Sequence, residues 1–199
     1  MWVVKIGGSL NDDPLLRDWL ALFAELGGGR VTLVCGGGAY AEEVRRAQRR
    51  WGFDDLAAHN MAVLAMMQSA YQAQGIEPRL QLATSQADIR RVLHGGGTAL
   101  WLPAEWLRDE AGPHTNWDNS GDSIALDLAL RLNAEQMALV KSCAVDARAT
   151  PAELMAAGVV DRRFVELAAG AGFSIELVQR TDITRMRSLL LGQDRRAGA

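Results

Sequence analysis

The chain has 199 residues, of which 49% are hydrophobic, and its formal net charge is -3. This length suits one domain with a sizeable core, and the mixed charge offers no basic face of the kind that binds nucleic acid. No apolar run reaches the roughly 20 residues that span a bilayer. The two cysteines, Cys35 and Cys143, match neither a disulfide scaffold nor a zinc motif. We therefore expect a reduced, cytoplasmic protein without nucleic-acid or membrane partners.

Short apolar runs alternate along the chain with longer amphipathic segments. The short runs predict strands at 2–6, 31–35, 79–82, 98–102, 137–141 and 174–178. The longer segments predict helices at 14–26, 39–51, 55–74, 85–94, 121–132, 161–170 and 182–190. This alternation is typical of an α/β domain, here a three-layer αβα sandwich with a mostly parallel central sheet. We expect one domain over residues 1–192 and a frayed polar tail at 193–199.

The distribution of lysine is unusual. Of the 21 lysines and arginines, only Lys5 and Lys141 are lysines, and both lie in apolar strand patterns. Coding bias explains the many arginines, but it does not explain where the two lysines stand. Lysine is a compact point charge on a thin stem, whereas arginine is a planar fork. A phosphate pocket at the end of a strand can require lysine.

Three runs of three glycines differ in what they follow. Residues 27–29 and 95–97 each follow a predicted helix, where glycine is an ordinary helix stop. Residues 36–38 instead follow a strand and open a helix. Ligands of open α/β sheets bind outside the carboxyl ends of the strands, and a helix N-terminus offers free backbone N–H groups to a phosphate. This third run is the one that predicts a binding site.

The first strand ends in a similar turn. Lys5 is followed by Gly7, Gly8 and Ser9, and a helix is predicted soon after. Two glycine turns at the ends of two early strands would form a two-sided cradle for phosphates. Neither turn matches the P-loop or the dinucleotide-binding fingerprint, so each is a weak signal by itself.

Two further segments carry charged residues at the ends of predicted elements. Residues 116–123 are polar, small or acidic and lead directly into a predicted helix. Asp122 then has two possible roles: it belongs to an N-terminal cap around Ser120, or it holds the two lysines in place. Residues 139–146 form a buried-looking strand that ends in a lysine and reaches Asp146, which either binds a ribose or closes a turn. A buried lysine is costly unless it is paired.

These elements, in this order, resemble the amino acid kinase family, which includes acetylglutamate kinase, aspartokinase, uridylate kinase and isopentenyl phosphate kinase. Residues 4–9 resemble the opening Lys-x-Gly-Gly-Ser signature, and residues 36–38 resemble the triple-glycine loop. Residues 118–124 resemble the segment that carries an organising aspartate, and residues 139–146 resemble the strand and loop that line the nucleotide. The resemblance covers nearly the whole chain and implies a small-molecule kinase that uses ATP and Mg²⁺.

The resemblance also implies a role for each site residue. Lys5, Asp122 and Lys141 would be catalytic, with Asp122 holding both lysines in place. ATP would be bound by Gly7, Gly8, Ser9, Gly36, Gly37, Gly38, Ser142 and Asp146. The acceptor would be bound by Arg45, Trp117, Asp118 and Ser120. Mg²⁺ would be held chiefly by the ATP phosphates and water, so no protein ligand for the metal is expected.

A narrower resemblance concerns a short-chain subfamily that includes a kinase of methanofuran-type cofactor biosynthesis. The acceptor of that kinase is (5-aminomethylfuran-3-yl)methyl phosphate. The resemblance to the subfamily lies in residues 36–38 with Ala41 and Arg45, in residues 51–53, 58–62 and 116–118, and in Val160 and Asp161 with Phe164. There are two departures from the wider family: no lysine follows Lys141, and Gly121 stands where many relatives have serine. A non-catalytic nucleotide or oxyanion binder, or a kinase of acyl-amino acids or nucleotide monophosphates, therefore stays open as an alternative.

The helix predicted at 55–74 contains a histidine and several methionines among apolar residues. His59 stands among apolar residues, where a hydrogen-bonded core histidine is more common than a catalytic base. Met61, Met66 and Met67 are typical of a core or of a dimer face. We therefore expect a homodimer or a higher homo-oligomer.

Overall fold

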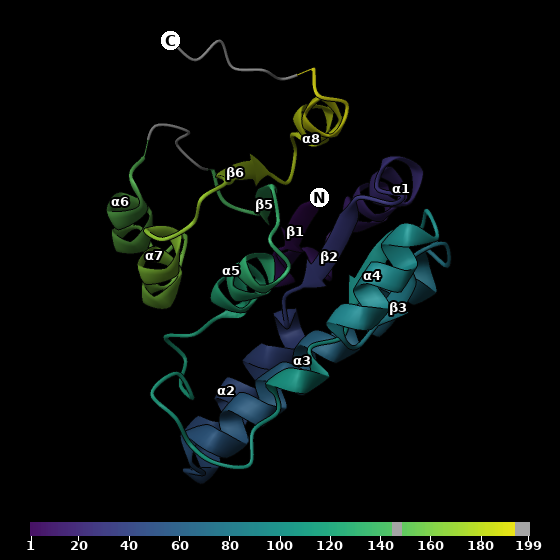
Figure 1. The fold of residues 1–199 in the computed structure, drawn as a ribbon. Coiled ribbons are helices and arrows are strands. Elements are labelled where there is room, and N and C mark those ends of the chain that lie inside the picture. The colour runs from purple at the N-terminus through teal and green to yellow at the C-terminus, as the bar shows by residue number, and fades with distance from the viewer. Residues whose placement is uncertain (145–148, 194–199) are drawn as a thin grey trace.

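The computed structural model describes residues 1–144 and 149–193. They form a six-stranded sheet with helices on both faces (Figure 1). The strands are β1 (Trp2–Ile6), β2 (Val31–Cys35), β3 (Gln81–Ala83), β4 (Ala99–Trp101), β5 (Gln136–Lys141) and β6 (Ser174–Gln179). The helices are α1 (Leu16–Leu26), α2 (Gly38–Trp51), α3 (Asp55–Ile76), α4 (Gln86–His94), α5 (Gly121–Arg131), α6 (Pro151–Ala156), α7 (Arg162–Ala168) and α8 (Ile183–Leu190). Short 3₁₀ turns lie at Gly8–Leu10 and Ala104–Trp106.

The sheet is parallel and has the strand order β3-β4-β2-β1-β5-β6. β1 lies near the middle, with Lys5 in register with Val34 of β2 and with Leu139 of β5. The chain extends the sheet first on the β2 side of β1 and later on the β5 side. The carboxyl end of β1 is therefore the point where the strand order reverses, which is where open α/β sheets bind ligands.

Alternate residues of the strands face opposite layers, as the period of two requires. Val4, Leu33 and Ala138 belong to the core that packs against α1, α8 and the later turns of α3. Val3, Val34 and Leu139 belong to the core that packs against α4, α5 and α7. Both faces are covered, so the central strands are apolar almost throughout. The predicted αβα sandwich with a parallel sheet is confirmed.

α2 and α3 form an antiparallel hairpin that extends beyond the sheet, at the bottom of Figure 1. α2 ends at Gly52, whose φ of +68° is the left-handed conformation that glycine adopts readily. Asp54 then caps α3 by accepting a hydrogen bond from Ala57 N at 2.8 Å. This hairpin provides one wall of the candidate site.

The predicted elements are present, and many of their ends differ by one or two residues. The helix predicted at 14–26 begins at Leu16. The strand predicted at 79–82 lies at Gln81–Ala83. α6 was not predicted, although Thr150 and Glu153 form a capping box around a proline at the start of the helix. The polar residues 194–199 of the expected tail lie outside the described residues.

The glycine runs at 27–29 and 95–97 pack against each other. Gly29 N donates to Gly97 O at 2.8 Å, and a Cβ on Gly28 would lie 2.5 Å from Gly96 O. They follow α1 and α4 and precede β2 and β4, so they lie at the opposite edge of the sheet from Lys5. The structural interpretation of these two runs is confirmed.

The other two glycine turns meet at the carboxyl edge of the sheet. A Cβ on Gly36 would lie 2.6 Å from Gly8 N, and a Cβ on Gly8 would overlap the backbone of Gly38. Gly38 also has a φ of +53°, which other residues rarely adopt. The two turns therefore touch through their main chains, and side chains there would separate them.

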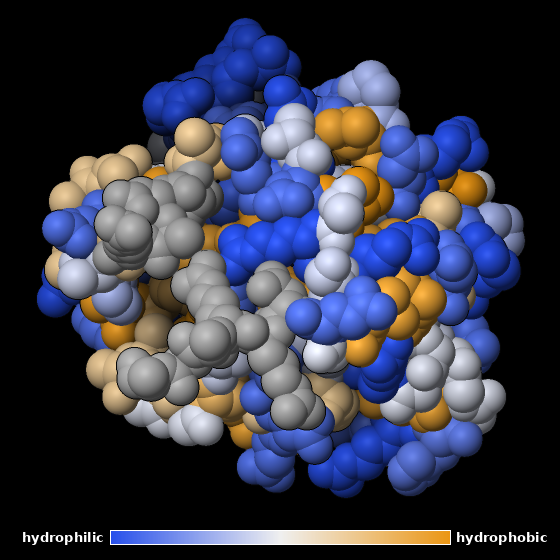
Figure 2. Space-filling model, turned by 90° about the horizontal axis from the view of Figure 1, so that it is seen from above, coloured by the Kyte–Doolittle hydropathy of each residue, from blue (hydrophilic) through white to orange (hydrophobic). Residues whose placement is uncertain are grey.

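The surface is mixed in character. Seen from above the end that carries α8, hydrophilic residues dominate, and hydrophobic residues form small separate patches (Figure 2). Across the described part of the chain, no helix is both long enough and apolar enough to cross a membrane.

We predict that Gly36→Ala destabilises the protein, because its Cβ would meet main-chain atoms that cannot rotate away. Overpacking of this kind costs about 1–3 kcal/mol, or roughly 2–12 °C in Tm for a chain of this size. Gly75→Ala is the matched control, because nothing lies within 4 Å of the added methyl group and alanine is favoured inside a helix. Thermal unfolding that shows equal Tm values for the two variants would contradict the close contact of the turns.

Candidate active site

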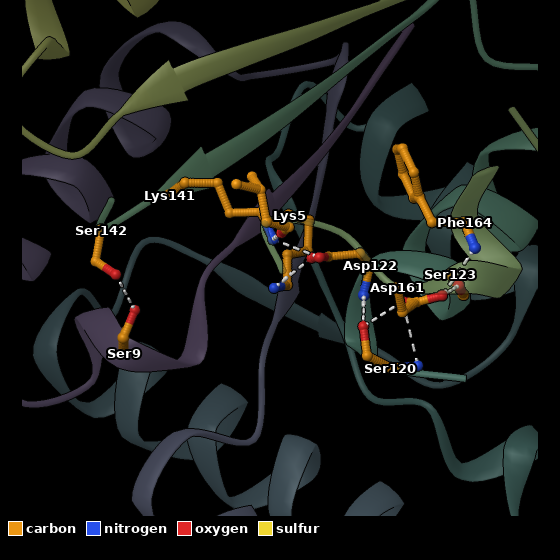
Figure 3. Close-up of polar contacts among 10 residues, drawn as sticks. Lys5, Ser9, Ser120, Asp122, Ser123, Lys141, Ser142, Asp161 and Phe164 are labelled. Atoms are coloured by element: carbon orange, nitrogen blue, oxygen red, sulfur yellow. Dashed lines mark hydrogen bonds and ion pairs between the residues drawn. The ribbon is translucent and has the colours of Figure 1, made fainter. Parts of the chain in front are cut away.

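Both lysines of the chain meet at one carboxylate (Figure 3). Lys5 Nζ lies 2.5 Å from Asp122 Oδ1, and Lys141 Nζ donates to Asp122 Oδ2. The side chains of Lys5 and Asp122 are 8% and 5% exposed, so this ion pair is buried. Two ammonium groups and one carboxylate leave a net charge of +1, which is a local excess suited to an anion.

Neighbouring elements bring the three side chains together. Lys5 and Lys141 stand at the carboxyl ends of β1 and β5, which are adjacent parallel strands. Asp122 lies in the first turn of α5, where Ser120 is the N-cap and accepts a hydrogen bond from Asp122 N at 3.2 Å. Lys141 Nζ also donates to Val159 O at 2.6 Å. Each ammonium group is thus held by a fixed partner.

Burial and charge act against each other in this cluster. Burial opposes ionisation of Asp122, but the charges and hydrogen bonds of Lys5 and Lys141 outweigh it and lower the pKa of the carboxyl group. Burial and the nearby charge of Lys5 lower the pKa of Lys141, and Asp122 only partly offsets them. Asp122 therefore stays ionised at neutral pH, and Lys141 loses its proton more easily than a free lysine does.

The glycine turns lie beside this cluster. Gly8, Gly36, Gly37 and Gly38 line the same pocket as Lys5. Gly7 N donates to Val140 O at 2.9 Å, which continues the strand pairing and leaves the following residues free to turn. Ser9 Oγ donates to Ser142 Oγ at 2.9 Å and so joins the turn after β1 to the end of β5. A glycine-lined surface next to an excess positive charge fits phosphate groups.

The pocket has a volume of about 380 Å³ and runs from Lys5 to the α2–α3 hairpin. Its apolar part is formed by Ala58, Ala62, Val63, Met66 and Ile124. Arg45 and Trp117 stand at the other end, with the guanidinium group 4.4 Å from the centre of the indole ring. The ring is fixed in turn because Trp117 Nε1 donates to Gln48 Oε1 at 2.7 Å.

Arg45 is also held in place from its own helix. Its Nη1 lies 2.5 Å from Glu42 Oε1, one turn earlier in α2. A guanidinium group is always charged and can donate two parallel hydrogen bonds to a phosphate or a carboxylate. The pocket therefore offers a second cationic group, separate from the lysines, and the paired Glu42 and Asp55 line the pocket as well.

His59 lines the pocket and is buried. One of its ring nitrogens, Nε2, lies 3.0 Å from Trp106 O, a carbonyl oxygen to which it can only donate. Burial, assisted by the charge of Arg108, lowers its pKa. The structure therefore agrees with a neutral, hydrogen-bonded histidine that fastens the segment after β4 to α3.

The structure brings most of the predicted site residues together, with two exceptions. Asp118 is exposed and lines a neighbouring hollow that also contains Arg162 and Arg163. Asp146 lies outside the described residues. A Cβ on Gly121 would lie at an ordinary distance of 3.6 Å from Lys5 Cε. A serine at this position is therefore compatible with the same geometry.

Three contributors to the site were not assigned a role from the sequence. Gln48 orients Trp117, Val159 O binds Lys141, and Asp161 accepts hydrogen bonds from Ser120. Only Asp161 carries a recognisable signal, because an aspartate before a helical pattern is a common N-cap. Its contact with α5 depends on how the helices pack.

In residues 1–144 and 149–193, no group of three or more His, Cys, Asp or Glu side chains is arranged to hold a metal ion.

The chain is similar in sequence to a curated protein. The chain is 26% identical over 141 residues to the [5-(aminomethyl)furan-3-yl]methyl phosphate kinase of Methanocaldococcus jannaschii. The match covers 69% of this chain and 63% of the relative, so the chain matches somewhat less than two thirds of that protein.

Solved structures show the same fold at lower identity. Uridylate kinase from Archaeoglobus fulgidus superposes with a TM-score of 0.69 at 14% identity, and the match covers 96% of both chains. UMP kinase from Bacillus anthracis gives a TM-score of 0.68 at 16% identity, with 96% of this chain and 91% of that chain covered.

The sequence model of the amino acid kinase family matches residues 1–144, which include both glycine turns, both lysines and Asp122. The chain therefore belongs to the amino acid kinase family.

Proposed function

We propose that this protein transfers the γ-phosphate of ATP to a small acceptor that is itself a phosphate monoester. The observation that carries the proposal is the shared carboxylate, which holds two ammonium groups side by side at the carboxyl edge of the sheet. Phosphoryl transfer requires alignment and the stabilisation of negative charge, with little covalent help from the protein. A rigid cluster of net charge +1 beside the glycine turns meets both requirements, although the N–H groups of Gly7 and Gly36 already donate to Val140 O and Ile6 O.

We assign the two sides of this cluster to the two substrates. The nucleotide would approach from the ends of β1 and β5, where Ser9 and Ser142 lie, with its terminal phosphates at Lys5, Lys141 and the glycine turns. The acceptor would occupy the pocket that runs from Lys5 to Arg45. Its reacting oxygen would then lie near Lys5, and an anionic group would lie within reach of Arg45.

Mg²⁺ would be bound mainly by the ATP phosphates and water. When bound, it neutralises charge on the β- and γ-phosphate oxygens. The residues of this chain would bind the remaining oxygens and orient the terminal phosphate.

The chemistry of the pocket favours a compact acceptor. Its floor of alanine, valine, methionine and isoleucine side chains suits a small apolar ring, and Arg45 suits a phosphate. A phosphate monoester is already ionised, so transfer to it requires no strong general base, and the hydrogen-bonded His59 need not act as one. An aminomethylfuran phosphate, the acceptor named for the archaeal relative, satisfies these conditions. A nucleotide monophosphate is the second candidate, favoured by the UMP kinase fold.

We also propose that the protein forms a homodimer through α3. Met61, Leu64 and Tyr71 are exposed and lie on one face of this helix at spacings of three and seven residues. A second copy of the same helix, packed antiparallel, would cover this apolar face of both chains. Sedimentation velocity reports the oligomeric state directly, and a monomer at micromolar concentration would contradict the dimer.

We predict that the wild-type protein, given Mg-ATP, phosphorylates [5-(aminomethyl)furan-3-yl]methyl phosphate with a kcat/KM at least about tenfold above that for UMP or N-acetylglutamate. Arg45→Ala should raise the KM for the monoester about tenfold or more and change the KM for ATP little. Arg46→Ala is the matched control, because Arg46 is the next arginine of α2 and pairs with Glu43 at the surface. Binding of Mg-ATP without turnover of any of the three acceptors would favour a non-catalytic nucleotide binder instead.

We predict that Asp122→Asn lowers kcat about a hundredfold or more, because misplaced ammonium groups no longer stabilise the transferred phosphate. It should also lower Tm by roughly 6–20 °C, since breaking a buried ion pair costs about 3–5 kcal/mol. Asp127→Asn, which removes an acid of the same helix that pairs with Arg131, is the control and should change both values little.

The stability of Asp122→Asn should depend on pH in a definite direction. Without the carboxylate, burial and the charge of Lys5 act on Lys141 unopposed, so Lys141 of the folded chain loses its proton below the unfolded value of about 10.5. The unfolded chain then binds more protons than the folded chain, so the stability of the variant rises with pH up to that value. A stability that falls over this range in denaturant titrations would contradict the mutual repulsion of the two ammonium groups.

A further inference from the structure

The carboxylate of Asp161 contacts two helices at once (Figure 3). As the N-cap of α7, its Oδ1 accepts a hydrogen bond from Phe164 N at 2.8 Å and another from Ser123 Oγ. Its Oδ2 accepts from Ser120 Oγ and from Ser120 N at 3.3 Å. Both serines belong to the start of α5, on either side of Asp122. One side chain thus joins the beginnings of α5 and α7.

The hydroxyl group of Ser120 connects Asp161 to Asp122. It has a single proton, which it donates to Asp161 Oδ2, and its lone pair accepts the hydrogen bond from Asp122 N. The direction of the hydroxyl group is therefore fixed by Asp161, and the first turn of α5 is fixed by the hydroxyl group. The position of the Asp122 carboxylate depends on this turn.

The same segment also contacts the second lysine. Val159 stands two residues before Asp161, and its carbonyl oxygen accepts the hydrogen bond from Lys141 Nζ. A displacement of residues 159–161 would therefore move a ligand of Lys141 and the cap of Asp122 together. Asp161 itself does not line the pocket that contains Lys5, so any effect on phosphoryl transfer would be exerted through these neighbours.

We infer that Asp161 is a positioning residue for the charged cluster: it sets the relative placement of Asp122 and Lys141 by joining α5 to the segment before α7. The inference rests on the proposed phosphoryl transfer for its effect on rate, but the placement itself can be measured without turnover. The alternative is that Asp161 does no more than cap α7, as Asp182 caps α8 through Arg185 N at 3.2 Å.

The two-lysine composition of the chain makes the test direct. Lysine labelled with ¹³C at Cε gives two signals, from Lys5 and Lys141, which Lys5→Arg and Lys141→Arg assign. The test variant is Asp161→Asn, because asparagine keeps one oxygen for the cap of α7 but presents an amide donor where Ser120 requires an acceptor. Asp182→Asn is the matched control, since it changes a helix cap away from the pocket.

We expect Asp161→Asn to shift the pKa of at least one lysine and to lower kcat about tenfold or more, with little change in the KM for ATP. Asp182→Asn should leave both lysine titrations and kcat as in the wild type. Lysine titrations in Asp161→Asn that match those of the wild type would overturn the inference and leave Asp161 as a plain helix cap.

The lysine titrations decide the inference even if the protein has no kinase activity or if Asp161→Asn does not fold. If the wild-type protein transfers no phosphate to the furan monoester, the proposed function fails, while the lysine titrations still decide the placement. If Asp161→Asn does not fold, Ser120→Ala takes its place, because it leaves the cap of α7 intact and removes the hydroxyl group that links Asp161 to Asp122. The same lysine shift is then expected, and an unchanged titration would again overturn the inference.

Discussion

A buried and a partly buried ammonium group, those of Lys5 and Lys141, share the buried carboxylate of Asp122, and the rest of the site is arranged around this contact. An isolated charge inside a protein is costly, so placing Lys5 and Lys141 at their strand ends without Asp122 would lower the stability of the fold. The reverse also holds, because the lysines are what keep the pKa of the buried carboxyl group low. One carboxylate cannot neutralise two cations, and the uncompensated charge faces the glycine-lined pocket. The same interaction thus stabilises the fold and creates an affinity for anions.

The glycine turns determine how closely the substrates can approach this charge. Because Gly8 and Gly36 touch through their main chains, the ends of β1 and β2 come together without intervening side chains. The backbone N–H groups of the turns and the ammonium groups of the lysines then act on the same small region. At the other end of the pocket, Arg45 is held by Glu42 and by the ring of Trp117. The distance between these two cationic regions limits the size of an acceptor that can contact both.

Much of this arrangement could be predicted from the sequence, and the reason is physical. Parallel strands end at the same edge of a sheet, which explains why the lysines at the ends of β1 and β5 lie close together. From the residues alone Asp122 was either a helix cap or the organiser of the lysines, and the organising role was implied by the resemblance to the amino acid kinase family. The order of strand, glycine and helix separated the run at 36–38 from the two structural runs.

Other features depend on packing that no local pattern encodes. Asp161 reaches residues about 40 positions earlier in the chain because α7 lies against α5. Asp118 was expected to bind the acceptor, but it lines the neighbouring hollow, while Trp117 beside it lines the pocket. The direction of side chains in an irregular loop follows from tertiary contacts such as the hydrogen bond from Trp117 to Gln48. α6 is different, because its capping box of Thr150 and Glu153 is a local pattern that the sequence itself carries.

The central claim is that the cluster of Lys5, Asp122 and Lys141 binds the phosphate that is transferred. The most direct measurement is a crystal structure of the wild-type protein with Mg²⁺ and a non-hydrolysable ATP analogue. The account predicts the terminal phosphate within hydrogen-bonding distance of both Nζ atoms and of the backbone of the glycine turns, with Asp122 still between the lysines. A nucleotide whose phosphates lie away from both lysines, with the ion pairs to Asp122 unchanged, would contradict it.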